Sequence, residues 1–354
     1  MLLVRLRSIG DTVLMTPCLA ALKTWRPDLK VDVLSESLAA PLLEGHPLID
    51  RLLLAPESTA SRLGLIGQLR KHSPDVSFNL HGGSTGAILS RLSGAKHSIG
   101  YKGLSCSWLL SDRAPAPDQI LDQKKIHSVE QQLALLRWSG VPVAASHPAL
   151  KLEVSPGARE RVSQKLIALG LSVSSDSNRG GFACIVPGAA FESKRWKAEG
   201  FAEVADYLCQ RWSLRSVIIA GPGQESLATR VINATRTKPV VISGLKLKEL
   251  EALIEMSFLF VGNDSGPMHI AAAFDRPIVA TWGSSDANVW HPWTEAPWKI
   301  VRADGASKEK STDLPDTIKQ ISLGDVTAAV DEVLQRALDA EQKIDAVNQT
   351  QRAI

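Results

Sequence analysis

The chain has 354 residues, of which 44% are hydrophobic and 22% charged, and its formal net charge is +3. At roughly 150 residues per domain, this length predicts two domains, each large enough to bury a core without disulfides or metal ions. The near balance of 40 basic and 37 acidic residues excludes a general nucleic-acid binder, which carries a strongly basic face. The apolar content excludes a disordered chain.

The four cysteines lie far apart and form no CxxC pair. Neither a zinc site nor a disulfide framework is therefore expected, and this sparse usage suits a reducing cytoplasm. No apolar run approaches the roughly 18 residues that span a bilayer, and the opening MLLVRLRSIGD lacks the pattern of a signal peptide. We expect a cytoplasmic protein without a transmembrane helix.

Short apolar runs alternate with helix-compatible stretches through the first half of the chain. Pro17 lies inside the first predicted helix and is expected to kink or disturb it, because proline lacks the N–H that continues a helix. Strands are predicted at Leu2–Leu6, Val31–Leu34, Arg51–Leu54, Val76–Leu80 and Ser98–Tyr101. Helices are predicted at Thr12–Trp25, Arg62–Lys71, Thr85–Leu92 and Val129–Ser139.

The polar segment Ser172–Gly181 is the best candidate for a linker or loop, and the alternation restarts after it. Repeated βα alternation on both sides predicts two α/β domains, each a doubly wound parallel sheet covered by helices on both faces. Strands are predicted at Phe182–Val186, Ser216–Ala220, Val240–Ser243, Phe258–Gly262, Pro277–Thr281 and Lys299–Arg302. Helices are predicted at Phe201–Arg211, Gln224–Ala234, Leu247–Met256 and Met268–Phe274.

The predicted boundaries place an N-terminal domain at residues 1–175 and a second domain at residues 176–322. A helix over residues 323–340 carries Val326, Val330, Val333 and Leu334 near one face. The polar tail at residues 341–354 is expected to fray. Two domains of this class leave a cleft between them, where ligands commonly bind.

Three glycine-rich turns each follow a predicted strand, and such turns lie where ligands bind in a doubly wound sheet. None has the GxGxxG or GxxxxGK[ST] pattern, which disfavours a classical dehydrogenase or kinase. The turns are Arg7–Asp11, which contains Ser8 and Gly10, then Val186–Ala190 around Gly188, and Gly262–His269.

The third turn has the clearest anion-binding features. Gly266 allows close approach of the backbone, and the helix that starts at Pro267 presents free N–H groups and a positive dipole end to a phosphate. Asp264 and Ser265 either cap this helix or hydrogen-bond sugar hydroxyls. His269 either contacts the same ligand or packs as an ordinary helix residue.

Two further side chains have chemistry suited to group transfer. Lys194 follows the second turn, where it would neutralise a diphosphate as a point charge; the alternative is a solvated surface lysine. Asp11 stands at the first strand-to-helix turn, where a carboxylate can act as a general base. The alternative for Asp11 is a simple helix cap.

Three blocks of this sequence resemble glycosyltransferase family 9, the ADP-heptose:lipopolysaccharide heptosyltransferases. They are RLRSIGDTVLMTPCLAALK, VPGAAFESKRWKAEGFAEVADYL and VGNDSGPMHIAAAFDRPIVATWGSSD, in order and at family-like spacing. The resemblance implies a GT-B fold, in which two Rossmann-like domains face across a cleft. It also implies inverting transfer of L-glycero-D-manno-heptose from ADP-heptose to the inner core of lipopolysaccharide, with no metal or other cofactor required.

The resemblance carries roles to matching positions of this chain. It implies Asp11 as the base that activates the acceptor hydroxyl and Lys194 as the residue that steadies the leaving diphosphate. The implied donor contacts are Ser8, Gly10, Gly188, Glu225 at the ribose, Leu245 near the adenine, Asp264 at the sugar hydroxyls, Ser265 and Gly266 at the phosphates, and His269. First or second heptose transfer stays open.

The acceptor side is predicted from charge. Residues 58–110 carry six basic residues against one acid, and Arg62, Arg91 and Lys96 are the candidates for binding a lipid-linked oligosaccharide or the inner face of the inner membrane. The alternative is ordinary charged surface. For the whole protein, the alternatives are a GT-B glycosyltransferase or epimerase that uses another nucleotide sugar, and a non-catalytic nucleotide-sugar-binding protein.

Overall fold

The structure is a computed structural model that describes residues 1–56, 59–144, 148–171, 181–303 and 317–352, without the side chains of residues 59–63 and 344–352. The chain divides into two compact units, Met1–Glu153 and Val154–Ile354. None of the helices in the described part is long and apolar enough to span a membrane. Residues 172–180 of the predicted linker Ser172–Gly181 lie outside the described residues.

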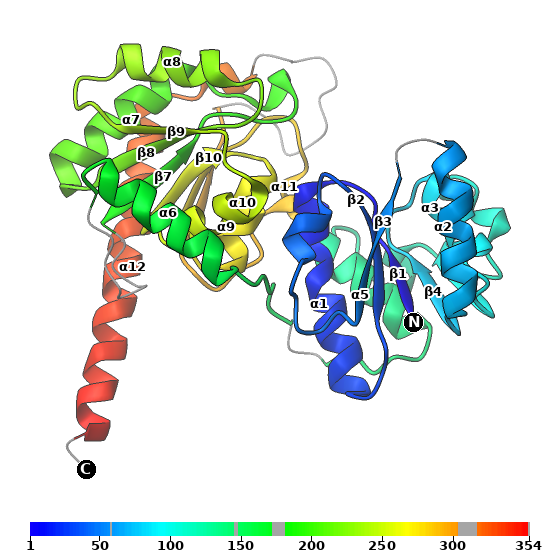
Figure 1. Ribbon diagram of the computed structural model, residues 1–354. Helices are drawn as coiled ribbons and strands as arrows, with labels where there is room; N and C mark the ends of the chain where they lie inside the picture. The colour runs from blue at the N-terminus through cyan, green and yellow to red at the C-terminus, as the bar shows by residue number, and fades with distance from the viewer. Residues whose placement is uncertain (57–58, 145–147, 172–180, 304–316, 353–354) are drawn as a thin grey trace. The chain divides into compact units, whose positions relative to one another are not determined.

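The first unit contains a parallel six-stranded sheet in the order β3-β2-β1-β4-β5-β6 (Figure 1). Five of its strands confirm the sequence prediction to within two residues at each end, and β6 was not predicted. The strands are β1 (Leu2–Val4), β2 (Asp32–Glu36), β3 (Arg51–Ala55), β4 (Val76–Asn79), β5 (His97–Tyr101) and β6 (Asp112–Ala114).

Helices cover both faces of this sheet. Alternate residues of β1 point to opposite faces, so Leu2 and Val4 join a core with Leu65 and Leu69 of α2, while α1 and α5 pack together on the other face. The helices are α1 (Ile9–Trp25), α2 (Thr59–His72), α3 (Ser84–Leu92), α4 (Pro117–Leu121) and α5 (Ser128–Trp138), with short 3₁₀ turns η1 (Ala40–Leu43) and η2 (Ser107–Leu109).

Helix α1 continues without a break from Ile9 to Trp25, with Pro17 inside it. The Val13 carbonyl would normally accept from the N–H at position 17, which proline lacks. The Thr16 hydroxyl donates to that carbonyl instead, at 2.8 Å. This hydrogen bond satisfies the orphaned acceptor within the buried part of the helix.

The second unit repeats the same topology. Its parallel sheet has the order β12-β11-β10-β7-β8-β9, so both sheets follow the 3-2-1-4-5-6 order of Rossmann folds when each is numbered from its own first strand. All six strands confirm the prediction. They are β7 (Phe182–Val186), β8 (Arg215–Ala220), β9 (Val240–Ser243), β10 (Leu259–Asn263), β11 (Ile278–Thr281) and β12 (Trp298–Val301).

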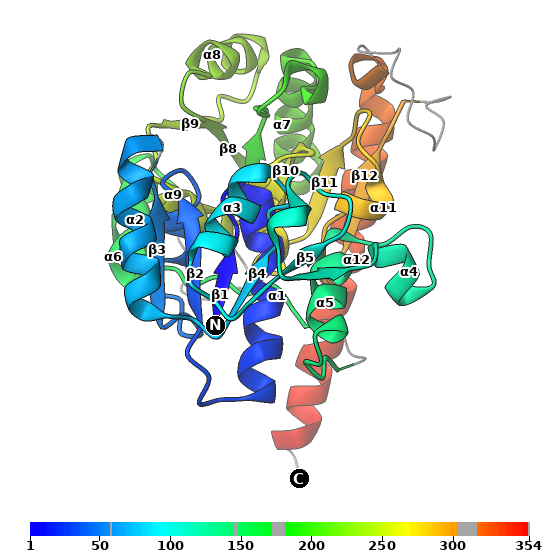
Figure 2. The same ribbon diagram turned by 90° about the vertical axis from the view of Figure 1, so that its right-hand side faces the viewer.

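Two helical layers also sandwich the second sheet. One core joins the sheet to α7, α8 and α12, and Figure 2 shows α12 beside β11 and β12. On the other side, α9 packs with α6 and α10. The helices are α6 (Pro156–Ala168), α7 (Ala198–Trp212), α8 (Glu225–Ala234), α9 (Leu247–Glu255), α10 (Gly266–Ala273), α11 (Ala287–Trp290) and α12 (Leu323–Arg352), with η3 (Glu192–Lys194) and η4 (Thr317–Gln320).

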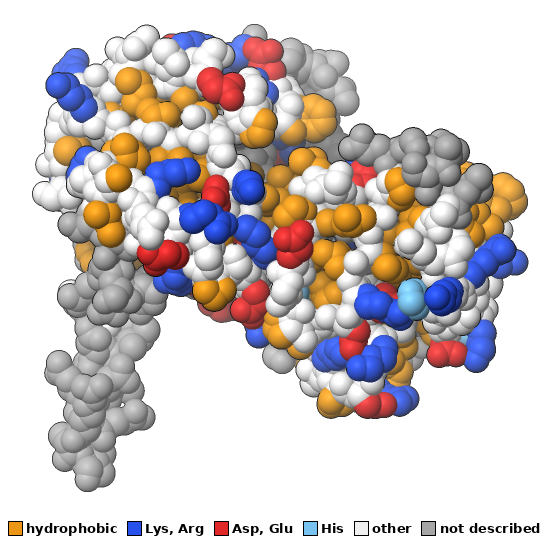
Figure 3. All heavy atoms as spheres, viewed as in Figure 1, with side chains coloured by type: hydrophobic (Ala, Val, Ile, Leu, Met, Phe, Trp, Pro, Cys, Tyr) orange, Lys and Arg blue, Asp and Glu red, His pale blue; other side chains and the backbone are white. Residues whose placement is uncertain are grey.

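Along the chain, the boundary between the two compact units falls between Glu153 and Val154, ahead of α6. The sequence prediction placed this boundary after residue 175. Ion pairs tie α6 to α9 of the second unit: Arg161 Nε lies 2.8 Å from Glu249 Oε1, and Arg159 pairs with Glu255. Figure 3 shows mixed basic and acidic side chains over these helices. The local sequence pattern could not indicate these ion pairs, because α6 and α9 lie far apart in the sequence.

The chain end differs from its prediction as well. The four apolar positions of α12, from Val326 to Leu334, are buried as expected. The helix does not end near residue 340, however, but continues to Arg352 through the segment predicted to fray.

Candidate functional site

Both sheets reverse their strand order between the first and fourth strands, β1 and β4 in the first unit and β7 and β10 in the second. Ligands of doubly wound sheets bind outside the carboxyl ends of strands at this reversal. Asp11 follows β1, Gly188 and Lys194 follow β7, and Asp264 follows β10. The topology therefore places these predicted residues at the two reversal points.

Asp11 occupies the first turn of α1. Its Oδ2 accepts hydrogen bonds from the Ser8 N–H at 3.3 Å and the Ser8 hydroxyl at 3.0 Å. Asp11 thus caps the helix, as the alternative interpretation held, and Gly10 lies buried beside it. Capping and proton transfer are compatible roles, because the carboxylate is held in one position at the edge of the sheet.

Arg5 is the main partner that sequence reasoning missed. It is buried at the end of β1, forms an ion pair with Asp11 and donates to the Leu80 carbonyl. Burial lowers the pKa of Arg5, and the Asp11 carboxylate opposes that shift. An arginine within the otherwise apolar LLVRL run was the available signal, because a buried arginine needs a carboxylate or carbonyl partner.

His81 and Glu36 complete this group of charged residues. His81 follows β4, and burial together with the nearby Arg5 charge lowers its pKa. Glu36, at the end of β2, accepts from Arg7 Nε at 3.2 Å. The carboxyl edge of the first sheet therefore gathers acids, arginines and a largely neutral imidazole from three strands.

Of the three predicted acceptor residues, Lys96 lies away from Asp11. Lys96 precedes β5, at the opposite edge of the sheet, and pairs with Asp75 at 2.8 Å. Arg91 is exposed in the last turn of α3. Arg62 lies on α2, and its side chain is outside the described residues.

In the second unit, Lys194 and Asp264 meet directly. Lys194 Nζ donates to Asp264 Oδ2 at 2.6 Å, and the Ser285 hydroxyl donates to the same oxygen at 2.5 Å. The Asp264 side chain is 5% exposed, whereas Lys194 is only partly buried. The lysine therefore keeps a solvent-facing side while a buried carboxylate positions it.

The Asn263 side chain forms hydrogen bonds with the turns around this pair. Its side-chain oxygen accepts from the Trp196 N–H at 2.9 Å, and its amide donates to the Pro187 carbonyl at 2.8 Å. A Cβ at Gly188 would lie 1.8 Å from Gln224 Oε1, so a larger residue here would displace the Gln224 side chain. These contacts set the path of the loop that carries Lys194.

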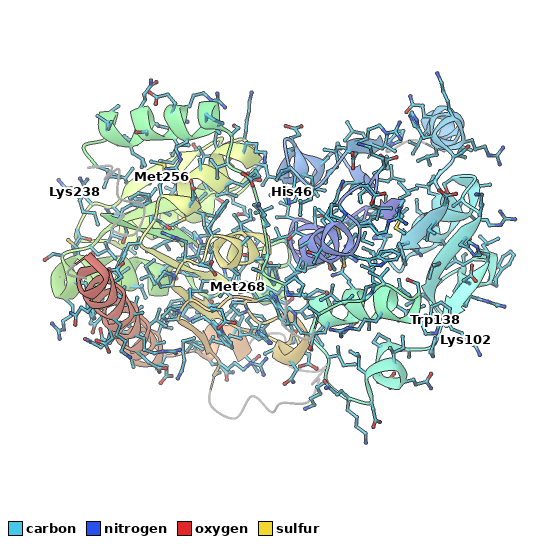
Figure 4. All side chains as sticks on the ribbon, turned by 90° about the horizontal axis from the view of Figure 1, so that it is seen from below. His46, Lys102, Trp138, Lys238, Met256 and Met268 are labelled. Carbon is cyan, nitrogen blue, oxygen red and sulfur yellow. The ribbon has the colours of Figure 1, made fainter. Side chains whose placement is uncertain are left out.

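The turn after β10 leads into α10 as predicted. Ser265 is the N-cap, Gly266 begins the helix and Pro267 lies in its first turn. The buried Ser265 hydroxyl has no hydrogen-bond partner among the described residues. His269 and Met268, the latter labelled in Figure 4, are buried on α10. The free N–H groups of this helix start suit an anionic ligand.

The remaining predicted donor residues lie along the same edge of the second sheet. Glu225 is exposed at the start of α8, after β8, and Leu245 is half-buried after β9. Among the described side chains, Lys194 and Asp264 hydrogen-bond to each other and Asp264 to Ser285, and neither bonds to Glu225 or Leu245. Their strands are neighbours in the sheet, so one elongated ligand can run along this edge.

Arg302 and Ser285 were missed by sequence reasoning. Arg302 follows β12 and donates from Nη2 to the Ser285 carbonyl at 2.9 Å. Burial lowers the pKa of Arg302, and Asp286 and Asp264 oppose that shift. Trp282 also donates to the Ser285 carbonyl, at 2.7 Å, and is buried. In the part of the chain that the structure describes, no cluster of His, Cys, Asp or Glu could hold a metal ion.

Two Rossmann-like sheets, one with an ion-paired acid at its reversal point and the other with a lysine beside a helix N-terminus, match the architecture of a GT-B glycosyltransferase. The family model for glycosyltransferase family 9 (heptosyltransferase) matches residues 62–319. The chain belongs to this family and is a glycosyltransferase.

Relatives and solved structures are similar over nearly the whole chain. Lipopolysaccharide heptosyltransferase 3 of Escherichia coli is 29% identical over 346 residues, which are 93% of this chain and 97% of that protein. A glycosyl transferase family 9 structure from Veillonella parvula has a TM-score of 0.82 at 25% identity and covers 94% of this chain and 96% of that one. The E. coli ADP-heptose lps heptosyltransferase II structure has a TM-score of 0.76 at 23% identity, with coverages of 96% and 99%.

Proposed function

We propose that this enzyme transfers L-glycero-D-manno-heptose from ADP-heptose to the inner core of lipopolysaccharide, with inversion at the anomeric carbon. The observation that carries the proposal is the Lys194–Asp264 pair beside the free N-terminus of α10, in a chain of this family. The relatives named as heptosyltransferases support the donor sugar and the acceptor.

Under this proposal, the second unit binds the donor. The diphosphate accepts hydrogen bonds from the N–H groups at Ser265 and Gly266 and meets the Lys194 ammonium. Asp264 holds Lys194 and contacts sugar hydroxyls. As the glycosidic bond breaks, negative charge grows on the diphosphate, and these fixed positive groups stabilise it more than they stabilise the intact donor.

The first unit supplies the base. The acceptor hydroxyl oxygen attacks the anomeric carbon while its proton passes to Asp11, and the electron pair of the broken bond leaves with ADP. Arg5 and Ser8 hold the carboxylate in one orientation. No metal or further cofactor enters this scheme, because the protein supplies the positive charge that the leaving group needs.

The acceptor under this proposal is a lipid-linked oligosaccharide, and the enzyme works in the cytoplasm at the inner face of the inner membrane. The basic character of the first unit between residues 58 and 110 supports an anionic acceptor. Nucleic acid is not a partner in this proposal.

The test measures ADP release from ADP-heptose with a heptose-deficient lipopolysaccharide acceptor. Asp11→Asn keeps the shape of the side chain but replaces one acceptor oxygen by an NH₂ group and removes the basicity, so turnover should fall by about 10²–10⁴-fold while ADP binding persists. Asp28→Asn is the matched control, since Asp28 is exposed and pairs with nearby Arg26 at 2.8 Å. Nuclear magnetic resonance of the product should show the inverted anomer.

Full turnover by a folded Asp11→Asn variant, checked by circular dichroism, would remove Asp11 as the base. Transfer from a UDP- or GDP-sugar in place of ADP-heptose would overturn the proposed donor.

A further inference from the structure

Three large apolar side chains are exposed on one part of the first unit. Trp108 on η2 is 72% exposed, and Leu104 in the preceding loop and Ile88 on α3 are each 39% exposed. The 3₁₀ turn η2 packs against α3, which brings the three together. We call these three residues the Trp108 patch. A grouping of large exposed apolar side chains usually marks an interaction surface.

The patch lies next to the edge of the sheet that carries Asp11. The loop that holds Leu104 and Trp108 follows β5 at its carboxyl end. A Cβ added to Gly82 would lie 3.4 Å from the Leu104 side chain, so Leu104 contacts the loop that begins with His81. The preceding residue, Leu80, accepts at its carbonyl a hydrogen bond from Arg5, the ion-pair partner of Asp11. A molecule seated on the patch would therefore present its attached groups close to the candidate base.

The chain segment that carries the patch contains cations and no acid. Residues 76–111 contain no Asp or Glu and include Arg91 and Lys102, whereas Lys96 of the same segment lies at the opposite edge of the sheet and pairs with Asp75. Arg91 lies three positions after Ile88 on the exposed face of α3. Figure 4 shows Lys102 at the outside of the first unit, and it is exposed. Apolar side chains rimmed by cations complement an anionic surface with an apolar interior.

We propose that the Trp108 patch inserts into the headgroup region of an anionic lipid membrane. Tryptophan prefers this interface because its ring is apolar and its indole N–H can remain hydrated. Arg91 and Lys102 would lie among the lipid phosphates. The inference rests on the proposed function, since a membrane-borne acceptor is what makes this location useful.

The experiment is co-sedimentation of the full chain with vesicles of phosphatidylglycerol and phosphatidylcholine in equal parts, compared with vesicles of phosphatidylcholine alone. Trp108→Ser should lower the partition into the anionic vesicles by about tenfold, because the interfacial burial of the indole is lost. Lys102→Glu should lower binding to the anionic vesicles only. The matched control is Trp25→Ser, because Trp25 is 37% exposed at the far end of α1.

A thermal melting curve of each variant serves as the control that the variant is folded. Equal vesicle binding by wild type and Trp108→Ser would overturn the proposal, as would equal losses in Trp108→Ser and Trp25→Ser. If Trp108→Ser instead dissociates a dimer in solution without changing vesicle binding, the patch serves a second copy of the chain and the membrane proposal is wrong.

Transfer to a delipidated, soluble acceptor separates this inference from the proposed function. Trp108→Ser should retain that activity, because the variant alters only the contact with lipid. A wild-type chain that transfers no heptose at all would overturn the proposed function, while the vesicle experiment would still decide the role of the patch.

Discussion

Asp264 is a buried carboxylate whose Oδ2 accepts from both Lys194 and Ser285. Burying a carboxylate costs free energy unless charged or hydroxyl donors compensate for the lost water. Because Lys194 is the charged donor and is partly exposed, the same ammonium can balance Asp264 and a bound diphosphate. The pair is thus a positioned cation rather than a simple surface salt bridge.

Replacing Lys194 by Met should lower turnover by about 10²–10³-fold, because the growing charge on the leaving group loses a fixed cation. Lys194→Arg should recover part of that loss. Lys197→Met is the control: Lys197 is exposed, three residues away, and lies over the Trp196 ring at 5.9 Å. The turnover of all three variants is measured as the initial rate of ADP release. Equal rates for Lys194→Met and Lys197→Met would contradict the role of Lys194.

Within helices and strands, a glycine is required for stability where a neighbouring backbone or aromatic ring leaves no space for a Cβ. A Cβ on Gly262, within β10, would lie 2.8 Å from the Phe260 ring and 3.1 Å from the Val186 carbonyl oxygen. A Cβ on Gly67, within α2, would meet nothing within 4 Å. Identical substitutions at these two positions should therefore have opposite effects on stability.

Gly262→Ala should lower the free energy of unfolding by about 1–3 kcal/mol, because the packed neighbours must shift. Gly67→Ala should raise it by about 0.5–1 kcal/mol, since alanine restricts the unfolded chain and favours the helix. Urea unfolding followed by circular dichroism measures both changes. A destabilised Gly67→Ala variant would show that α2 is not a regular helix at that position.

At the scale of the whole molecule, each unit has its own sheet and its own core. Leu334 of α12 is fully buried in the core of the second unit, and Leu133 of α5 is buried in the first. The two sheets share no strand, so a cavity in one core should loosen that unit first.

Leu334→Ala should cost about 2–5 kcal/mol, with faster amide hydrogen exchange confined to the strands β7 to β12. Leu133→Ala is the corresponding variant of the first unit, and its faster amide hydrogen exchange should be confined to β1 to β6. Exchange read by mass spectrometry resolves the two sets of peptides. Equal loosening of both sheets by either variant would mean that the chain unfolds as one cooperative unit.

The sequence alone determined the α/β class, eleven of the twelve strands and the turns that carry Asp11, Lys194 and Asp264. These features are local: hydrophobic periodicity marks the strands and helices, and glycine marks the turns. The short strand β6 has too little apolar character to show such a signal.

Only the tertiary structure decided which charged groups meet. Lys194 and Asp264 lie 70 positions apart, and Arg5 lies 75 positions from the Leu80 carbonyl, yet parallel strands bring their carboxyl ends to one edge. The parallel sheet also separates Lys96 from Asp11. Lys96 precedes β5 whereas Asp11 follows β1, so the two residues lie at opposite edges of the sheet. Sequence periodicity reports which face of an element is buried, whereas contacts between distant residues depend on strand order, which only the folded sheet establishes.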